Sequence, residues 1–288
     1  RRDYSLLVTP SRSAPAGVEH VVDLLRSRSA CVLTGAGIST ESGIPDYRGP
    51  ERRGRPATPI TYREFTTSAE ARRRYWARSA IGWPWMAQRD PNRGHRVVAA
   101  LERSGIATGL ITQNVDGLHG VAGTRRIVEL HGALRSVICL DCRKIESRHG
   151  LQERMLVQNP GWLRHAGEIA PDGDVHLHPE VAREFRVPAC LRCGGTLKPD
   201  VVFFGESVPR ERVDDAFAIL AEAQMLLVLG SSLTVYSGYR FAVTARREGK
   251  PVAIINDGPT RADDEATVKV AARLGATLDV LDSALELI

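Results

Sequence analysis

The sequence predicts the α/β fold class: a doubly wound parallel sheet with a small module inserted in it. Two observations carry this prediction. Apolar runs of strand length alternate with segments of helical spacing along most of the 288 residues. Two Cys-x-x-Cys pairs, separated by residues 143–189, interrupt that alternation and mark the insertion. We therefore expect a flexible tail at residues 1–15, a main domain made of residues 16–132 and 198–288, and an inserted module at residues 133–197.

The individual elements follow from hydrophobic periodicity. Residues 18–26 place apolar side chains at helical spacing, and residues 30–34 form an apolar run that predicts the first strand. The same criteria predict further helices at residues 68–80, 93–103, 151–157, 211–223, 238–248 and 263–274. They predict further strands at residues 106–112, 127–130, 198–206, 225–229, 251–255 and 277–281.

The composition is that of an ordinary globular chain, with 43% hydrophobic residues and a formal net charge of +5. This mild basic excess agrees with binding of an anionic ligand and also with a weak attraction to nucleic acid, so the net charge does not distinguish these two functions. No apolar run approaches the roughly 18 residues that a membrane span needs, so we expect no membrane partner. The Arg- and Ser-rich residues 1–15 are interpreted as a tail in preference to the remnant of a transit peptide.

A glycine-rich loop follows the first predicted strand, where residues 35–49 read GAGISTESGIPDYRG. Gly35 and Gly37 would let backbone N–H groups approach a pyrophosphate that a residue with a Cβ would hold off. The loop is not the ordinary dinucleotide fingerprint, because Thr40 stands where that pattern has its third glycine. From Asp46 onward the loop is too polar for a crossover helix, which favours a nucleotide-binding loop.

Polar or small residues also follow later strands. Gln113, Asn114 and Asp116 come directly after one strand. His131 follows the next strand, and Gly230-Ser231-Ser232 ends a later one. Because the carboxyl ends of parallel strands meet at one edge of a sheet, we expect these groups to converge on one pocket. The alternatives are a polar turn that caps the next helix through Asp116, and a histidine satisfied by its surroundings.

The two Cys-x-x-Cys pairs predict a metal site. Cys139 with Cys142, and Cys190 with Cys193, each place two thiolates on one tight turn. Four thiolates complete a tetrahedral shell that zinc accepts without an open catalytic position. We therefore expect one structural Zn²⁺ that holds the inserted module together. Such pairs favour a metal site in a reducing compartment over disulfides.

Several motifs, in a fixed order, resemble those of the sirtuins, the NAD-consuming protein-lysine deacylases. They are GAGIS, PDYRG, TQNVDGLH, ELHG, the paired CxxC, VVFFGE, GSSL and a late IN, and the match spans residues 35–274. Further stretches resemble the second class of this family. The resemblance implies a Rossmann-like large domain with an inserted zinc module, and a cleft between them where NAD meets an acyl-lysine side chain.

The resemblance also implies roles for individual residues. His131 matches the general base, and Asn114 and Asp116 would hold the nicotinamide carboxamide, so these three are the catalytic candidates. The cofactor-binding candidates are Gly35, Ala36, Gly37, Ile38, Ser39, Thr40, Ile44, Pro45, Asp46, Tyr47, Arg48, Gln113, Asn114, Val115, Asp116, Gly230, Ser231, Ser232, Asn256, Asp257, Gly258 and Leu274. The candidates for binding an extended substrate peptide are Val202, Phe203, Gly205, Glu206, Val235 and Tyr236.

The implied reaction removes an acyl group from lysine and consumes NAD, giving nicotinamide, free lysine and O-acyl-ADP-ribose. The partners would be acyl-lysine-bearing proteins or peptides, and no specific nucleic acid. The expected location is the cytoplasm of a bacterium, with the mitochondrial matrix as the alternative. Members that prefer acidic acyl groups carry a Tyr-x-x-Arg pair. Tyr62 and Arg63 are adjacent, which disfavours desuccinylation.

Other functions stay open at this point. Protein mono-ADP-ribosyl transfer, or removal of a long-chain or lipoyl group, would use the same motifs. A zinc-ribbon nucleic-acid-binding protein agrees with the net charge and the paired cysteines, but it leaves the polar groups at the strand ends unexplained. An ordinary NAD dehydrogenase would carry an acidic residue about twenty residues beyond the glycine loop. Residues 52–58 stand there instead and contain none.

Overall fold

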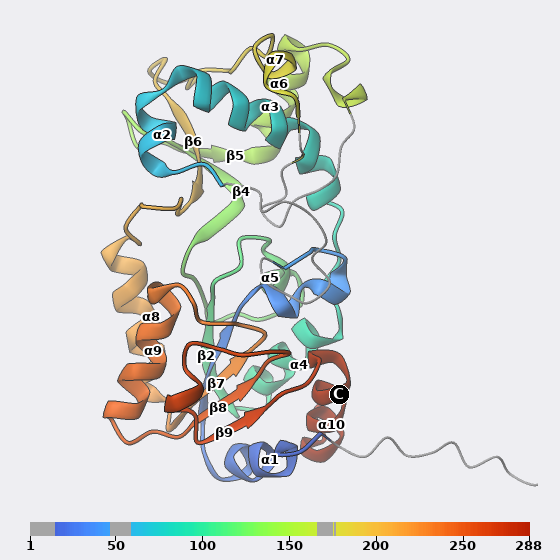
Figure 1. Cartoon of the computed structure of the whole chain (residues 1–288), viewed down its shortest axis with the longest axis vertical. Coiled ribbons are helices and arrows are strands. Elements are labelled where there is room, and N and C mark those ends of the chain that lie inside the picture. The colour runs from blue at the N-terminus through green and yellow to red at the C-terminus, as the bar shows by residue number, and fades with distance from the viewer. Residues whose placement is uncertain (1–14, 47–58, 166–174, 176) are drawn as a thin grey trace, which may run out of the picture.

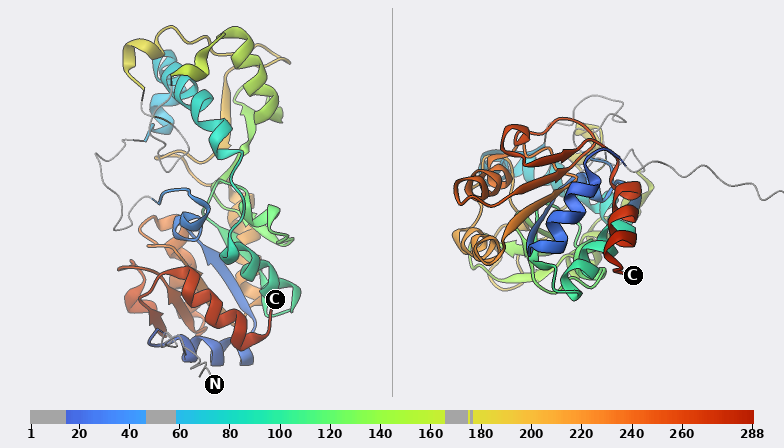
Figure 2. Two further views of the ribbon diagram at one scale, coloured as in Figure 1. Left: turned by 90° about the vertical axis from the view of Figure 1, so that its right-hand side faces the viewer. Right: turned by 90° about the horizontal axis from the view of Figure 1, so that it is seen from below.

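The computed structural model describes residues 15–46, 59–165, 175 and 177–288. These residues form two lobes that follow one another along the longest axis of the molecule (Figure 1). The larger lobe contains a parallel sheet, and the smaller lobe contains a short antiparallel sheet surrounded by helices. A view from the side shows the narrower region where the chain passes between the lobes (Figure 2). The fold class predicted from the sequence is therefore confirmed.

The sheet of the large lobe is parallel, and its described strands follow the order β3-β2-β1-β7-β8-β9. The chain runs from β1 outward to β2 and β3, and after the small lobe it returns to β7 on the other side of β1. The strand order therefore reverses between β1 and β7, which is where sheets of this kind bind ligands. The strands span Ala30–Thr34 (β1), Ala107–Thr112 (β2), Ile127–Glu129 (β3), Met225–Leu229 (β7), Val252–Ile255 (β8) and Val268–Val270 (β9).

Helices cover both faces of this sheet. Val32 of β1 joins a core with α1, α4 and α10, whereas the next residue, Leu33, joins a core with α8 and α9. This alternation is the period of two of a strand, and because both faces are covered the central strands are apolar throughout. The helices span Val18–Ser27 (α1), Arg93–Arg103 (α4), Arg210–Glu222 (α8), Tyr236–Arg247 (α9) and Leu274–Leu285 (α10).

The small lobe is built around the antiparallel sheet β5-β4-β6. Trp76 of α3 is fully buried against this lobe in one core with Cys139 and Leu151, and its Nε1 donates a hydrogen bond to the Leu197 carbonyl at 3.2 Å. The small lobe therefore includes α2 and α3, which the expected domain division had placed in the main domain. Its elements span Tyr62–Thr67 (α2), Ala69–Met86 (α3), Gly132–Cys139 (β4), Ile145–Ser147 (β5), Arg148–Gln158 (α6), Pro179–Ala182 (α7) and Leu197–Val201 (β6).

Some predicted elements differ from the structure. The predicted strand at residues 198–206 forms in part as β6, but it pairs antiparallel with β4 and so lies outside the parallel sheet. The predicted strand at residues 277–281 belongs to α10, whose buried side chains at positions 277, 278, 281 and 282 have helical spacing. The predicted helix at residues 263–274 is instead a short turn followed by the edge strand β9, where Val268 and Val270 are β-branched.

The remaining short elements are α5 and four 3₁₀ turns among the described residues. Most of the expected tail, residues 1–14, lies outside them. No described helix combines the length and the apolar character that a membrane crossing needs. The short elements span Leu118–Val121 (α5), Ala36–Ile38 (η1), Thr40–Ser42 (η2), Trp162–Arg164 (η3) and Asp263–Glu265 (η4).

Candidate active site

A cavity of about 910 Å³ lies between the two lobes, at the point where the strand order reverses. The loops after β1, β2, β7 and β8 form one wall, and β6 with the segment after it forms the other. Most of the residues predicted for the site line this cavity. They are Gly35, Ala36, Gly37, Ser39, Ile44, Pro45, Asp46, Gln113, Asn114, Val115, Asp116, His131, Val202, Phe203, Gly205, Glu206, Gly230, Ser231, Ser232, Val235, Tyr236, Asn256, Asp257 and Gly258.

The other predicted residues lie elsewhere. Ile38 is buried in the core beneath α4, and Thr40 is exposed, with its Oγ1 donating to the Gly37 carbonyl at 3.0 Å. Leu274 begins α10 and packs behind Gly230, so that it supports the loop after β7 without lining the cavity. Tyr47 and Arg48 fall outside the described residues.

The glycines of the first loop pack closely against the loop after β7. A Cβ on Gly35 would lie 2.7 Å from Ser231 Cβ, and one on Gly37 would lie 2.9 Å from Gly230 Cα. The Gly35 and Gly37 amides donate to the carbonyls of Leu229 and Gly230, at 3.1 and 2.9 Å. These two amides are therefore already hydrogen-bonded within the protein, and the approach of other backbone N–H groups of the loop to a pyrophosphate stays a prediction. The absence of a Cβ at these glycines lets the loops after β1 and β7 pack against each other.

Asn114 and Asp116 are held in place by Ser39. The Asn114 Nδ2 group donates to Ser39 Oγ and to the Gly35 carbonyl, both at 3.1 Å. Ser39 Oγ in turn donates to Asp116 Oδ2 at 2.7 Å, and the Leu118 amide donates to Asp116 Oδ1 at 2.9 Å. Burial raises the pKa of Asp116, and these two hydrogen bonds oppose the rise. The side-chain amide of Asn114 and the carboxylate of Asp116 are thus fixed side by side in the lining of the cavity. We call this pair the polar floor.

Two histidines with tilted rings in contact, His95 and His119, lie behind this floor. The ring centroids of His95 and His119 are 4.7 Å apart. His95 Nε2 lies 3.4 Å from Ser39 Oγ, and His119 Nε2 lies 3.0 Å from Thr34 Oγ1. Burial lowers the pKa of His95 to about 4 and the pKa of His119 well below its usual value. Both rings are therefore neutral near pH 7 and support the polar floor without adding charge to it.

His131 follows β3, and its hydrogen bonds define its tautomer. The Nδ1 atom lies 3.0 Å from the Gln113 carbonyl, which can only accept, so Nδ1 carries the proton. The Nε2 atom lies 2.8 Å from Ser237 Oγ and accepts its hydrogen bond. Burial lowers the pKa of His131, and the positive charges of Arg212 and Arg240 add to that effect. The ring is therefore a neutral base whose lone pair is on Nε2.

The segment after β6 is held rigidly on the opposite side of the cavity. Glu206 accepts a hydrogen bond from the Phe203 amide at 2.8 Å and forms an ion pair with the buried Lys198 ammonium at 3.0 Å. The Tyr62 amide donates to the Phe204 carbonyl at 2.9 Å. The Glu206 carboxylate, the Lys198 ammonium and the Tyr62 amide all hold the short loop at residues 203–206. An extended chain would therefore meet a preformed wall.

Several cavity residues were not predicted from the sequence. Ile60, Tyr75, Met86 and Leu134 line it with apolar side chains, and Ser237 and Arg240 line it from α9. The apolar group comes from three separate segments, and no local pattern marks those segments as one wall. Ser237 is the last residue of the edge, residues 234–237, that the resemblance implies for the substrate strand, but its contact with His131 was not predicted.

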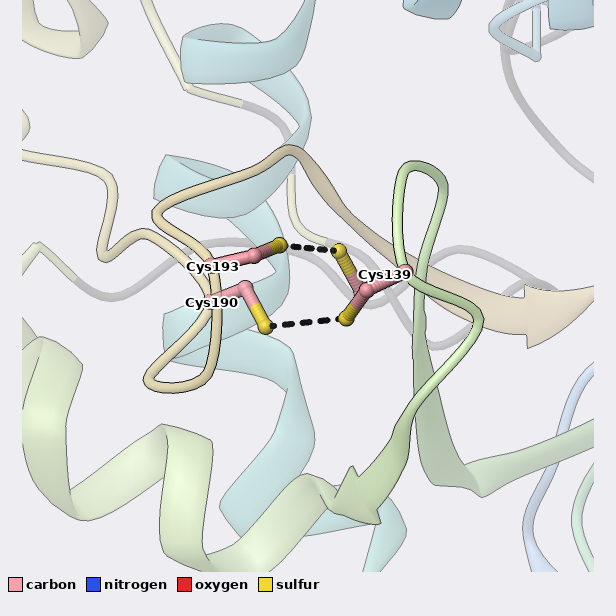
Figure 3. A group of neighbouring side chains, drawn as sticks. Cys139, Cys190 and Cys193 are labelled. Carbon is pink, nitrogen blue, oxygen red and sulfur yellow. Dashed lines mark hydrogen bonds between the residues drawn. The ribbon is translucent and has the colours of Figure 1, made fainter.

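The four cysteines form the predicted cluster, and their sulfur atoms all lie within 4.8 Å of one another (Figure 3). Cys139 Sγ is 3.6 Å from Cys193 Sγ, and Cys142 Sγ is 3.7 Å from Cys190 Sγ. A tetrahedral zinc ion with bonds of ~2.3 Å needs sulfur atoms roughly 3.8 Å apart. The cluster therefore fits a structural zinc site, and it ties the turn after β4 to the turn before β6.

Comparison with known proteins identifies the family. A model of the Sir2 family matches residues 35–237. The chain belongs to the Sir2 family. NAD-dependent protein deacetylase 1 of Streptomyces coelicolor is 52% identical to this sirtuin over 273 residues, 94% of this chain and 91% of that protein. The mitochondrial NAD-dependent protein lipoamidase sirtuin-4 of Bos taurus is 50% identical over 289 residues, 98% of this chain and 91% of that protein.

Solved Sir2 structures agree with the sequence relatives. A Sir2 complex with a p53 peptide and NAD⁺ has a TM-score of 0.73 and 30% identity, covering 93% of this chain and 97% of that chain. A Sir2 complex with an acetylated peptide has a TM-score of 0.72 at the same identity and coverage. The resemblance found in the sequence motifs is thus confirmed for the fold and for the family.

One argument about the acyl group of this sirtuin needs correction. Tyr62 and Arg63 are adjacent, but Tyr75 and Arg78 of α3 do have the Tyr-x-x-Arg spacing. Tyr75 lines the cavity, whereas the Arg78 Nε donates to the Val175 carbonyl at 3.0 Å. The absence of the pair therefore cannot be used against acidic acyl groups.

Proposed function

We propose that this sirtuin is an NAD-dependent protein-lysine deacylase, with acetyl-lysine proteins as its main substrates. The observation that carries the proposal is the state of His131. Its Nδ1–H is committed to the Gln113 carbonyl, so its basic Nε2 is presented inside the same cavity as Asn114 and Asp116. A neutral base beside a fixed amide and a fixed carboxylate suits acyl transfer in which a hydroxyl must lose its proton.

NAD fits the large-lobe side of the cavity. The loops after β1, β7 and β8 offer small residues, hydroxyl groups and the side chains of Asn256 and Asp257 to a dinucleotide. NAD supplies the ribose carbon that the acyl oxygen attacks as nicotinamide leaves. Asn114 donates through Nδ2 within the protein, and among the described residues no donor reaches its Oδ1. That oxygen is therefore suited to receive the N–H of the nicotinamide carboxamide.

With NAD bound, His131 would take a proton from a ribose hydroxyl through Nε2, the atom that Ser237 Oγ contacts in the structure. For this the hydroxyl must replace Ser237 Oγ, which lies 2.8 Å from that nitrogen in the structure. The Gln113 carbonyl holds Nδ1–H and favours the protonated ring once it forms. The pKa lowered by burial keeps the ring neutral before the reaction, which is the state that a base needs.

The acylated peptide would lie between the segment after β6 and the start of α9, on backbone hydrogen bonds. The lysine side chain would enter the cavity between Phe203 and Val235, and its acyl group would meet the apolar residues Ile60, Tyr75 and Leu134. This wall supports a second candidate, the removal of a larger acyl group. The relative named as a lipoamidase gives that candidate added weight. The protein would work in a bacterial cytoplasm or, alternatively, in a mitochondrial matrix.

The test is mass spectrometry of acyl-lysine peptides that carry acetyl, propionyl, long-chain, lipoyl or succinyl groups, incubated with and without NAD. Free lysine and O-acyl-ADP-ribose, formed only with NAD, are the expected products, with the acetyl peptide among the fastest. Transfer of ADP-ribose to protein without any deacylation would replace the proposal by the transferase alternative. Unchanged NAD with every peptide would reject both.

A further inference from the structure

Arg240 is a cationic group of the cavity for which neither the fold nor the proposed reaction accounts. It lies three residues after Ser237 on α9, so the two side chains are on the same face of the helix, about 4.5 Å apart along its axis. Ser237 Oγ contacts His131 Nε2 at 2.8 Å. Both Ser237 and Arg240 line the cavity. Arg240 is therefore less than one helical turn from Ser237, the residue that contacts the proposed base His131.

The guanidinium group has no anionic partner within the described part of the chain. Its Nε atom is buried and has no hydrogen-bond partner there. No ion pair or side-chain hydrogen bond of Arg240 is found among the described residues. Its guanidinium carbon lies 5.4 Å from the centroid of the Tyr236 ring, a cation–π contact. A buried guanidinium N–H without an acceptor is costly, so a ligand that supplies one would bind well here.

Three acidic residues of the segments around α9 and β6 have partners other than Arg240. Asp200 accepts two hydrogen bonds from Arg212 at 2.9 Å, and Glu206 is paired with Lys198 at 3.0 Å. Glu265 Oε1 accepts from the Tyr239 hydroxyl, and among the described residues the buried Glu265 Oε2 has no hydrogen bond to Arg240 or to any other group. The charge of Arg240 is thus left unbalanced by these carboxylates.

We propose that Arg240 is a specificity-determining residue that binds a carboxylate side chain of the substrate protein close to the acylated lysine. This inference rests on the proposed deacylase function, because it places the substrate strand against Val235 and Tyr236. The Tyr236 side chain is 60% exposed, so Arg240 and its ring contact lie at the mouth of the cavity. A strand entering there passes the guanidinium group before its lysine reaches His131.

Two other anionic groups fit this position less well. The carboxylate of an acidic acyl group would be at the far end of the lysine side chain, in the wall that Tyr75 shares with the apolar Ile60, Met86 and Leu134. The NAD phosphates would follow the loops after β1 and β7, whereas Arg240 comes from the body of α9. A flanking Asp or Glu of the substrate is the carboxylate that meets the guanidinium group without leaving the strand.

The test uses acetyl-lysine peptides that carry Asp, Asn or Lys at each of the three positions on either side of the lysine. For wild type we expect the KM of the best Asp peptide to be about tenfold below that of its Asn counterpart. Arg240→Gln should bring this ratio close to one, Arg240→Lys should restore part of it, and Arg240→Glu should turn the preference toward Lys. Arg246→Gln, at an exposed position of the same helix, should keep the wild-type ratio.

The inference is overturned if Arg240→Gln keeps the Asp preference. It is also overturned if that change alters only the KM for NAD or only the ratio of succinyl to acetyl peptides. Binding of fluorescent Asp and Asn peptides, measured by anisotropy without NAD, gives the same comparison in the absence of turnover. A wild-type protein that discriminates in binding but deacylates nothing would reject the proposed function and support the role of Arg240. Turnover of all peptides without discrimination would do the reverse.

Discussion

The side chain of Ser237 is hydrogen-bonded to the imidazole of His131, with 2.8 Å between Ser237 Oγ and His131 Nε2. Because Nδ1 donates to the Gln113 carbonyl, the serine hydroxyl must donate to Nε2. The serine thus occupies the lone pair that a ribose hydroxyl would use. His131 lies two residues after β3, and Ser237 is the second residue of α9. The return of the chain to β7 beside β1 brings these two distant segments together.

Replacing His131 by Asn should remove nearly all deacylation, because the side-chain amide is not a base. We expect a loss of about 10²–10⁴-fold in turnover of an acetyl-lysine peptide, measured by mass spectrometry. Thermal unfolding should change little, because an amide of similar size still has a donor for the Gln113 carbonyl. More than a tenth of wild-type turnover in this variant would contradict the role of His131 as the base.

Replacing Ser237 by Ala should shift the pH dependence of the reaction. Burial lowers the pKa of His131, so the acid limb of the wild-type profile of kcat/KM should lie below pH 6.5. The serine hydroxyl donates to the neutral ring and thereby favours it, so its removal should raise the pKa of His131 and move the acid limb to higher pH. An unmoved acid limb in Ser237→Ala would show that the hydrogen bond does not set the pKa of the base.

Gly37→Ala should damage the cofactor side of the cavity. The added Cβ would lie 2.9 Å from the Gly230 backbone, which cannot rotate away. We expect a destabilisation of about 1–3 kcal/mol in urea unfolding, together with weaker NAD binding. Gly120→Ala is the matched control, because its Cβ would meet no atom within 4 Å and it lies in the short helix α5. Equal effects of the two changes would mean that the close packing of the loops is unimportant.

The contact between Gly37 and Gly230 also marks a limit of prediction from the sequence. The pattern GAGIS indicates a tight, ligand-facing loop, and the structure does place this loop at the cavity. It could not indicate that the glycines face Gly230 and Ser231, because that contact depends on the strand order, in which β7 returns beside β1. The location of the loop was therefore predictable, and the close packing of its glycines on the loop after β7 was not.

The same limit applies to the carboxyl-terminal part of the chain. Met225–Leu229 was predicted as a strand because five apolar residues between polar ones fit a strand covered on both faces. Residues 277–281 mix apolar residues with Thr and Asp at a length that suits a strand or a helix turn, and packing on α1 and α4 decides in favour of the helix. Arg240 could not be predicted as a cavity residue from the sequence, because the chain has many arginines and only the fold places this one in the cavity.

Cys190→Ser should release the zinc of the small lobe. The change removes one of four sulfur atoms that lie within 4.8 Å of one another, and an open shell binds zinc far more weakly. We expect elemental analysis to find close to one zinc per wild-type chain and much less in the variant, with earlier thermal unfolding. Cys31→Ala is the control, since Cys31 is buried in β1 outside the cluster, and this variant should keep its zinc. A full zinc content in Cys190→Ser would contradict the four-thiolate site.

The free energy of unfolding should fall as the pH drops from about 6.5 toward 4. Burial lowers the pKa of His95 in the folded chain to about 4 from its ordinary value of 6.5. Between these values the unfolded chain takes up a proton at this position and the folded chain does not, so acid favours unfolding. The contribution of His95 is at most about 3 kcal/mol, and His119, whose pKa is also lowered by burial, acts in the same direction.

Asp116 acts in the opposite direction, because burial raises its pKa in the folded chain. A comparison of wild type with a His95 variant cancels the contributions of Asp116 and His119 to the pH dependence, because both proteins contain these groups. We expect His95→Gln to show a shallower loss of stability between pH 6.5 and 4 than wild type, in urea unfolding at several pH values. His149→Gln is the matched control, since the His149 side chain is 76% exposed, and it should follow the wild-type curve. If wild type and His95→Gln lose stability in parallel over this range, His95 is not kept neutral by burial, and the polar floor beneath Ser39 contains a charged ring.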